Sequence, residues 1–310
     1  MIVSASYKTD IPTFYGEWFR NRLNAGFCRM VNPFNRHQHF KVPLNPGEVD
    51  GFIFWTKNIG PFLPVLELVG ERGQPFMVQH TINAYPRALE SRVVDAERAV
   101  YSFRQVADRF GPKVAVWRYD TIIFSTLTPP DFHRANFERL AKLLEGSTDE
   151  VVVSFMQVYE KTRRNMNEAG RQHGFVWSDP PEVEKHALLK ELVQIARTRG
   201  MRLTMCSQPE NVIDGVGIAR CVDADRLRAI AGRSFAATLD GSREACGCFK
   251  SKDIGDYDTC PHGCVYCYAV RDRDLALSRF RQHDPEGEYL FPVPPPPPSA
   301  SKQLGMFPTD

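Results

Sequence analysis

The chain lacks several features that would assign it to a protein class directly. It has no run of 18 apolar residues, so no segment is expected to span a membrane. Its 39 basic and 37 acidic side chains leave a net charge of only +2, which removes any global electrostatic argument for nucleic-acid binding. The first residues, Met1–Ser6, lack the regions of a signal peptide and are typical of a strand. We therefore expect a cytoplasmic protein.

Two sequence motifs are also missing. No glycine-rich G-x-G-x-x-G follows the first apolar run, which argues against a dinucleotide-binding fold of the Rossmann type. No two C-x2-C halves are present, although structural zinc knots usually pair them. The eight cysteines are expected to be reduced, as ligands or core residues in a cytosol.

What is present is the composition and pattern of a globular α/β protein. Apolar residues make up 43% of the 310 residues and charged residues 25%. Short apolar or aromatic runs alternate with amphipathic stretches of helical period. The predicted strands are residues 2–6, 50–57, 76–82, 114–120, 151–156 and 202–205. The clearest predicted helices are one that starts near Asp10 and Pro12, and residues 87–110, 132–144, 182–199 and 266–282.

This alternation predicts parallel strands joined by right-handed helical crossovers. The fold class that we expect is α/β, as a full or partial (β/α) barrel, with a doubly wound sheet as the alternative. Residues 1–206 would form the barrel body, and residues 207–285 a cysteine-rich extension that completes the same domain. Residues 286–310, which include a proline-rich run over 292–298, would form a flexible tail.

Three cysteines lie close together in Cys260-Pro-His-Gly-Cys264-Val-Tyr-Cys267-Tyr-Ala. This C-x3-C-x2-C spacing puts three thiolates on one tight loop, and thiolates are the soft ligands of iron–sulfur clusters and of zinc. Three ligands without a matching fourth predict a cluster in which one iron keeps an open coordination position, as a catalytic metal requires. A structural zinc site, or thiols that are close by chance, are the alternatives.

The stretch resembles the hallmark of the radical S-adenosylmethionine (SAM) superfamily, C-x3-C-x-aromatic-C. Cys260, Cys264 and Cys267 match its cluster ligands, and Tyr266 matches the aromatic residue beside the SAM adenine. The longer string C-x-H-G-C-x-Y-C-Y-A is similar to that of spore photoproduct lyase and DNA-repair-photolyase-like proteins. The chain also resembles an uncharacterised family in which a radical-SAM-type cysteine cluster ends the chain. Because at least six predicted strands precede the motif, the barrel would be permuted or capped by the cysteine segment.

The resemblance implies two cofactors, a [4Fe-4S] cluster and SAM bound at its unique iron. One electron, from a donor such as flavodoxin or ferredoxin, would cleave SAM and release a 5′-deoxyadenosyl radical that abstracts a hydrogen atom from a substrate. The sequence does not identify that substrate. One alternative is DNA or RNA repair or modification by the same chemistry. Another is a non-catalytic protein whose cysteines bind an iron–sulfur cluster or zinc.

Polar residues follow the ends of the predicted strands. In a (β/α) barrel the carboxyl ends of the strands face one mouth, where function concentrates. Lys57, His80 and Arg118 are the residues that we expect to line this mouth as catalytic candidates. Capping of the following helices is the alternative role for polar residues at such positions.

Four further cysteines, Cys206, Cys221, Cys246 and Cys248, make one complete four-thiolate set. Four thiolates fill the coordination of a cluster or of a zinc ion. The sequence therefore predicts a second metal site, with a second iron–sulfur cluster as one occupant. Cys28 lies in an apolar segment and is expected to be a packed thiol.

The last residues contain a short motif of a different kind. Gln303–Phe307 reads Q-L-G-M-F, which resembles the peptide with which bacterial DNA-handling proteins bind the sliding clamp. A match over five residues is weakly specific, and an apolar tail that docks on its own domain is the alternative. The clamp and nucleic acid are thus the macromolecular partners that the sequence suggests.

Overall fold

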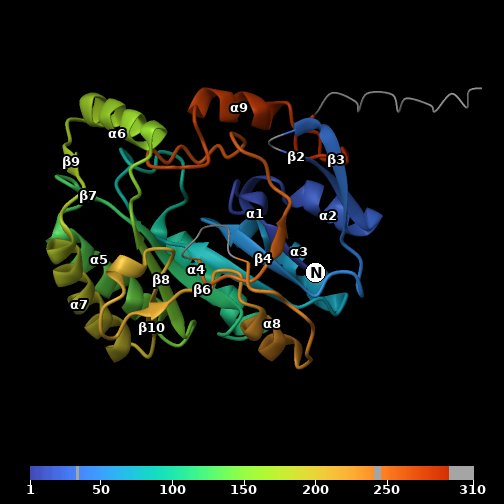
Figure 1. The fold of residues 1–310 in the computed structure, drawn as a ribbon, viewed down its shortest axis with the longest axis horizontal. Helices are drawn as coiled ribbons and strands as arrows, with labels where there is room; N and C mark the ends of the chain where they lie inside the picture. The colour runs from blue at the N-terminus through green and yellow to red at the C-terminus, as the bar shows by residue number, and fades with distance from the viewer. Residues whose placement is uncertain (33–34, 241–245, 293–310) are drawn as a thin grey trace, which may run out of the picture.

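The structure, a computed structural model, describes residues 1–32, 35–240 and 246–292. Its centre is a sheet of eight parallel strands in the order β11-β10-β8-β6-β5-β4-β1-β12 (Figure 1). These strands are β1 (Ile2–Ala5), β4 (Gly51–Thr56), β5 (Phe76–Thr81), β6 (Ala115–Ile122), β8 (Glu150–Phe155), β10 (Arg202–Met205), β11 (Gly217–Ile218) and β12 (Ser251–Asp253). The predicted parallel α/β arrangement is confirmed.

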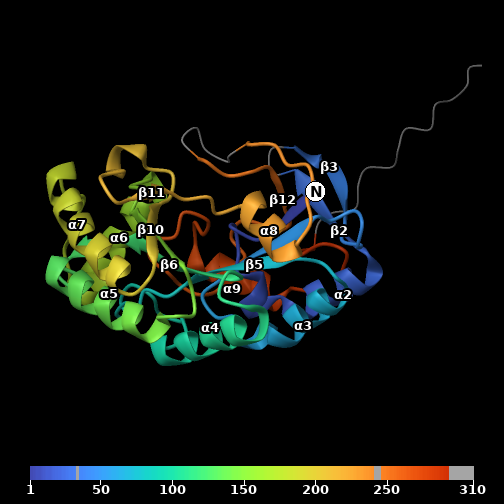
Figure 2. The same cartoon turned by 90° about the horizontal axis from the view of Figure 1, so that it is seen from below.

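Helices alternate with the strands along the chain. They are α1 (Ile11–Phe14), α2 (Gly16–Ala25), α3 (Leu63–Glu71), α4 (Ala96–Phe110), α5 (Pro130–Leu144), α6 (Glu160–His173), α7 (Glu182–Thr198), α8 (Ala224–Ala231) and α9 (Arg273–Arg281). Figure 2 shows α2, α3, α4, α5 and α7 following one another along one face of the sheet. The expected helices 132–144 and 182–199 correspond to α5 and α7.

Successive strand residues point to opposite faces, and the two faces differ. On the helix side, Phe52 and Phe54 of β4 meet Phe19 of α2 edge-on, with ring centroids 5.6 and 5.4 Å apart. On the other side, Ile53 packs in a smaller core with residues from the ranges 219–237 and 246–249, including Leu227 of α8. The second face is thus covered by irregular chain and α8, and it is this face that holds the polar site.

The strands follow one another in chain order, except that β12 adds to the far side of β1. This order is the one expected of a permuted (β/α) barrel, but closure is not observed, since β11 and β12 are the two edges of the sheet within the described residues. β11 and β12 are only two and three residues long. Between them, residues 219–237 and 246–249 pack on the sheet, so the chain continues over one face instead of closing a ring.

The predicted helix over residues 87–110 is wrong in its first nine residues, because α4 begins at Ala96 after the N-cap Asp95. The segment before it pairs with the cysteine loop through backbone hydrogen bonds, from Arg92 N to His262 O at 3.0 Å and from Val265 N to Leu89 O at 3.1 Å. This pairing satisfies backbone groups that a helix would otherwise use, so a tertiary contact overrides local propensity.

The predicted helix over residues 266–282 also starts too early, since α9 begins at Arg273. The Asp272 side chain caps it by accepting hydrogen bonds from Asp274 N and Leu275 N. The residues before the cap continue the cysteine loop, where Ala269 O accepts a hydrogen bond from Asp258 N at 3.0 Å.

A two-stranded hairpin lies outside the main sheet and was not expected from the sequence. It consists of β2 (Phe27–Asn32) and β3 (Asn35–Pro43), and residues near 288 lie beside it (Figure 1). Arg29 of β2 pairs with Glu288 at 2.6 Å, and His39 Nδ1 lies 2.8 Å from the hydroxyl of Tyr289. The tail predicted to start at residue 286 is therefore anchored at its beginning.

Two predictions about partners concern the sliding clamp and the membrane. The clamp-like peptide Gln303–Phe307 lies outside the described residues. In the part of the chain that is described, no helix is both long and apolar enough to cross a membrane.

Candidate functional site

A cavity of about 510 Å³ opens at the carboxyl ends of the central strands. Side chains at or just beyond the ends of β1, β4, β6 and β8 line one side of it, and the cysteine loop lines another. Of the eight cysteines, the seven in its lining are Cys206, Cys221, Cys246, Cys248, Cys260, Cys264 and Cys267. Cys28 is instead buried in the core, as the sequence predicts. The structure thus brings both predicted thiol sets to one cavity, which has the size of a small-molecule site.

The cysteine loop needs a glycine at residue 263. Gly263 has a φ of +73°, which side-chain-bearing residues rarely adopt, and a Cβ there would lie 2.2 Å from Ser91 Oγ. The loop therefore turns tightly against the segment around Ser91. This turn presents the thiols of Cys260, Cys264 and Cys267 to the cavity.

These three residues fit an iron–sulfur cluster in their chemistry. Burial raises the pKa of each of the three thiols, so that their thiolate forms require a compensating cation such as a metal. The Cys267 sulfur accepts a hydrogen bond from Ala269 N at 3.3 Å, a contact that tunes cluster sulfurs.

A site in which several side chains bind the same metal ion differs from a cluster site. Within the described residues, no three His, Cys, Asp or Glu side chains are grouped so that they could hold one metal ion. A four-iron cluster does not require such a group, because each thiolate binds a different iron.

Tyr266 and Lys57 form one wall of the cavity through a buried carboxylate. Glu90 accepts hydrogen bonds from Lys57 Nζ at 2.8 Å, from Asn83 Nδ2 at 3.2 Å and from the Tyr266 hydroxyl. Burial favours the neutral acid, but Lys57 and the hydrogen-bond donors outweigh it, so the pKa of Glu90 is lowered. Burial likewise opposes the charge on Lys57, yet Glu90 raises its pKa. Both side chains are therefore charged at neutral pH.

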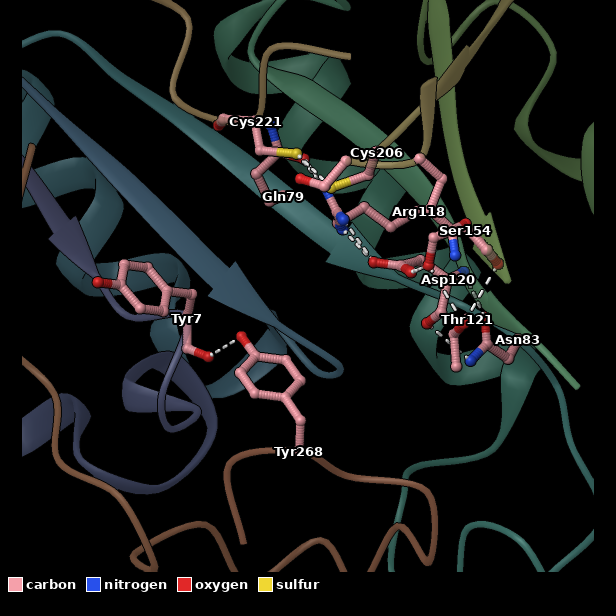
Figure 3. A network of polar contacts seen from close by, with 12 residues as sticks. Tyr7, Gln79, Asn83, Arg118, Asp120, Thr121, Ser154, Cys206, Cys221 and Tyr268 are labelled. Atoms are coloured by element: carbon pink, nitrogen blue, oxygen red, sulfur yellow. Dashed lines mark hydrogen bonds and ion pairs between the residues drawn. The ribbon is translucent and has the colours of Figure 1, made fainter. Parts of the chain in front are cut away.

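Arg118 and Asp120 form a second charged pair on β6. Arg118 Nε donates to the Asp120 carboxylate at 3.0 Å, and Ser154 of β8 donates to the same carboxylate (Figure 3). Burial opposes the Asp120 charge, but Arg118 and then Ser154 outweigh it and lower the pKa of Asp120. Arg118 also donates from Nη1 to the Cys221 sulfur at 2.9 Å. The pair thus connects the strand ends to the second thiol set.

Of the three predicted mouth residues, Lys57 and Arg118 line the cavity and His80 does not. His80 points to the helix side of β5, where it stacks on Phe103 of α4 with ring centroids 5.5 Å apart. Burial lowers its pKa to about 4. Its position follows from strand alternation, because Gln79, one residue earlier, points to the opposite face and contacts Arg118 there.

Two carboxylates of the site were missed by the sequence analysis. Glu90 lies in a segment predicted to be helical, so nothing in the pattern placed it beside Tyr266. Asp10 carried a usable signal, since it precedes Pro12 as a helix N-cap. Its carboxylate also accepts from Lys57 N at 2.8 Å, and it lies 2.7 Å from Nε2 of His262 in the cysteine loop. The N-cap position of Asp10 does not predict its contacts with Lys57 and His262.

The family of the chain follows from a comparison with known protein families. The model described as "Domain of unknown function (DUF1848)" matches residues 2–269, which includes the whole parallel sheet and the three loop cysteines. The chain belongs to this family. No curated protein matches the chain. Because the DUF1848 description states no activity, the reaction has to be inferred from the site.

Proposed function

We propose that this DUF1848 chain is a radical-SAM-type [4Fe-4S] enzyme that reductively cleaves SAM and abstracts a hydrogen atom from an unidentified substrate. The observation that supports this most strongly is spatial. Three thiols in the superfamily's spacing, the adjacent Tyr266 and a charged strand-end wall line one cavity, although about 200 residues of chain separate the loop from β4.

In this proposal Cys260, Cys264 and Cys267 each hold one iron, and the fourth iron keeps a position open toward the cavity. A cluster bound there would supply one electron to the SAM sulfonium, releasing methionine and the 5′-deoxyadenosyl radical that takes the substrate hydrogen. The protein contributes a water-poor cavity and fixed neighbours for the reacting groups.

The charged residues give the cavity wall polar groups for a ligand. Lys57, paired with Glu90, and Asp120, paired with Arg118 and 21% exposed, both lie in the lining. Because each charge already has a partner, the wall is balanced and can offer hydrogen bonds to the polar methionine moiety of SAM. Tyr266 lines the same cavity, and its hydroxyl is fixed by Glu90, which orients the ring that the superfamily places beside adenine.

We also assign the sheet to the (β/α) class as a partial, permuted barrel. The sequential strand order and the helices along one face support this assignment (Figure 2). A reaction of this type needs an external one-electron donor such as flavodoxin or ferredoxin, and reduced thiols fit a cytoplasmic location.

The test is whether the reduced protein responds to SAM at its metal. The protein is purified and reconstituted without oxygen, analysed for iron and sulfide, reduced with dithionite and measured by EPR before and after SAM is added. We expect a cluster signal that changes with SAM, that is lost in Cys264→Ala and that persists in Cys28→Ala. A protein that binds zinc in place of iron, or one in which no cluster signal responds to SAM, would leave a non-catalytic metal protein.

A further inference from the structure

The four remaining cavity cysteines are neighbours of one another. Cys206 follows β10 and Cys221 follows β11, and their sulfur atoms are 3.5 Å apart (Figure 3). The Cys248 sulfur accepts a hydrogen bond from Val222 N, next to Cys221, at 3.4 Å, and Cys246 packs against the same small core. Residues that lie up to 42 positions apart in the chain therefore bring four thiols together.

These thiols lie between a small apolar core and the cavity. Cys221 is 3% and Cys248 6% exposed, and both pack with Ile53, Met77 and Val116 of the sheet. Cysteines that only fill a core need no polar partners. Here the sulfur atoms of Cys206 and Cys221 meet, Cys221 also accepts a hydrogen bond from Arg118, and all four cysteines line the cavity that the loop cysteines line.

The buried guanidinium group of Arg118 contacts one of these four thiols. Arg118 is 4% exposed, and its Nη1 atom donates to the Cys221 sulfur at 2.9 Å and to Gln79 Oε1 at 3.1 Å. Gln79 in turn donates to the backbone carbonyl of Cys221 at 3.0 Å. The guanidinium is thus held in place on β6 with a sulfur atom as one of its acceptors, as expected if that sulfur carries negative charge.

We propose that Cys206, Cys221, Cys246 and Cys248 hold a second iron–sulfur cluster, of the [2Fe-2S] type. Four thiolates complete the coordination of such a cluster with two on each iron, and the 3.5 Å between the sulfur atoms of Cys206 and Cys221 fits two thiolates on one tetrahedral iron. This cluster has no open position and would transfer electrons without binding SAM. No three described His, Cys, Asp or Glu side chains are grouped so that they could hold one metal ion, which favours a cluster whose thiolates are divided between two irons over a single zinc ion.

Arg118 is a positioning residue in this assignment. An N–H···S hydrogen bond and a nearby positive charge stabilise the reduced, more negative cluster. Arg118→Gln is therefore expected to shift the reduction potential of the second cluster to a more negative value. The potential of the cluster on Cys260, Cys264 and Cys267 is expected to stay unchanged. Equal shifts in both, or none in either, would contradict this role.

The experiment counts iron, sulfide and zinc in anaerobically reconstituted protein. Wild type is expected to hold about six irons, and the Cys246→Ala/Cys248→Ala variant about four. The Cys260→Ala/Cys264→Ala/Cys267→Ala variant is expected to hold about two. Cys28→Ala, which removes a thiol outside the cavity, should match wild type. Because the two variants report on separate sites, failure of the loop cluster and failure of the second cluster are distinguishable.

Two results would overturn the second cluster. One is about four irons in wild type that persist in Cys246→Ala/Cys248→Ala. The other is one zinc per chain that this variant loses, with no additional iron. Mössbauer spectra of wild-type protein give a reading that does not depend on folding of the variants. SAM should then change about one iron in six, whereas a change in about one iron in four would mean a single cluster.

Discussion

Nε2 of His262 lies 2.7 Å from the carboxylate of Asp10, which joins the cysteine loop to the N-terminal end of α1. The same carboxylate accepts hydrogen bonds from Thr13 N and Lys57 N, each at 2.8 Å. Burial opposes its charge, but His262 and the two backbone donors outweigh it and lower the pKa of Asp10. One buried carboxylate therefore fixes the loop relative to the start of α1 and the end of β4.

Asp10→Ala is expected to lower both iron content and stability. It removes the acceptor of three hydrogen bonds, and each bond to a charged group contributes about 1.5–3 kcal/mol. Iron analysis and urea unfolding measure the two effects. The matched control is Asp223→Ala, which removes the cap of α8 and should cost about 1 kcal/mol without loss of iron from the cysteine loop. Equal iron in Asp10→Ala and wild type would contradict the fixing role of Asp10.

Neutralising Glu90 should leave Lys57 as an uncompensated buried charge. Glu90→Gln keeps the size and the acceptor oxygen of the side chain, and we expect it to lower the free energy of unfolding by about 3–5 kcal/mol. Adding Lys57→Met should restore part of this loss, because no charge is then left alone. Urea unfolding of the two single variants and the double variant gives the coupling.

An exposed ion pair provides the control for this cycle. Glu67 and Arg109 pair on the surface with side chains 47% and 43% exposed, and Glu67→Gln should cost less than about 1 kcal/mol. SAM cleavage is expected to fall in the double Lys57→Met/Glu90→Gln variant even where stability returns. If SAM cleavage and stability both recovered in the double variant, the Lys57–Glu90 pair would have only a structural role.

Gly263→Ala is expected to prevent the cysteine loop from forming. A positive φ costs a side-chain-bearing residue about 1–2 kcal/mol, and the added Cβ also meets Ser91 Oγ. Gly174, at the end of α6, has a similar φ of +70° but open space around its Cβ position. Gly174→Ala should therefore cost about 1–2 kcal/mol with full iron content, whereas Gly263→Ala should also lose iron. If both variants kept their iron, the tight contact with Ser91 would be dispensable.

His80→Phe should change the pH dependence of stability and leave SAM cleavage intact. The pKa of His80 is about 4 in the folded protein and about 6.5 when unfolded, so below pH 6.5 the unfolded chain binds a proton that the folded chain does not. Stability is therefore lost as the pH falls from about 6.5 toward 4, by about 2 kcal/mol between pH 7 and pH 5. Neither ring nitrogen has a hydrogen-bond partner among the described residues, so an apolar ring can replace it.

The measurement compares urea unfolding at pH 7 and pH 5 for His80→Phe and wild type, so that losses common to both cancel. The variant should lose about 2 kcal/mol less than wild type. An identical loss in the two proteins would show that His80 does not titrate as a buried neutral ring. Loss of SAM cleavage in His80→Phe would return His80 to the site.

The sequence predicted the features that depend on local pattern. Buried strands such as residues 76–82 and amphipathic helices such as 182–199 follow from period and length. It also predicted that Cys260, Cys264 and Cys267 lie on one loop. The predicted strand ends identified Lys57 and Arg118 as cavity residues, but they also identified His80, which lies on the other face of the sheet. A shift of one residue along a strand reverses the face that a side chain reaches, and the sequence pattern does not fix the strand ends to one residue.

What the sequence could not give are contacts made by chain pairing. Glu90 reaches Tyr266 only because residues 89–92 pair with the cysteine loop, and a helical pattern hides that pairing. β12 joins β1 across almost the whole chain, and three residues are too short for a periodic signal. The hairpin of β2 and β3 contacts residues near 288 in the same way. Partners this far apart are selected by tertiary packing and leave no local trace.

The most direct test of SAM cleavage by the cysteine loop is the formation of 5′-deoxyadenosine. Reconstituted protein is incubated with SAM and dithionite under anaerobic conditions, and the nucleoside is quantified by chromatography. Wild type and Cys28→Ala should form it, and Cys264→Ala should not. Nucleoside formation that survives Cys264→Ala, or none from wild-type protein with a full cluster content, would contradict the proposed function.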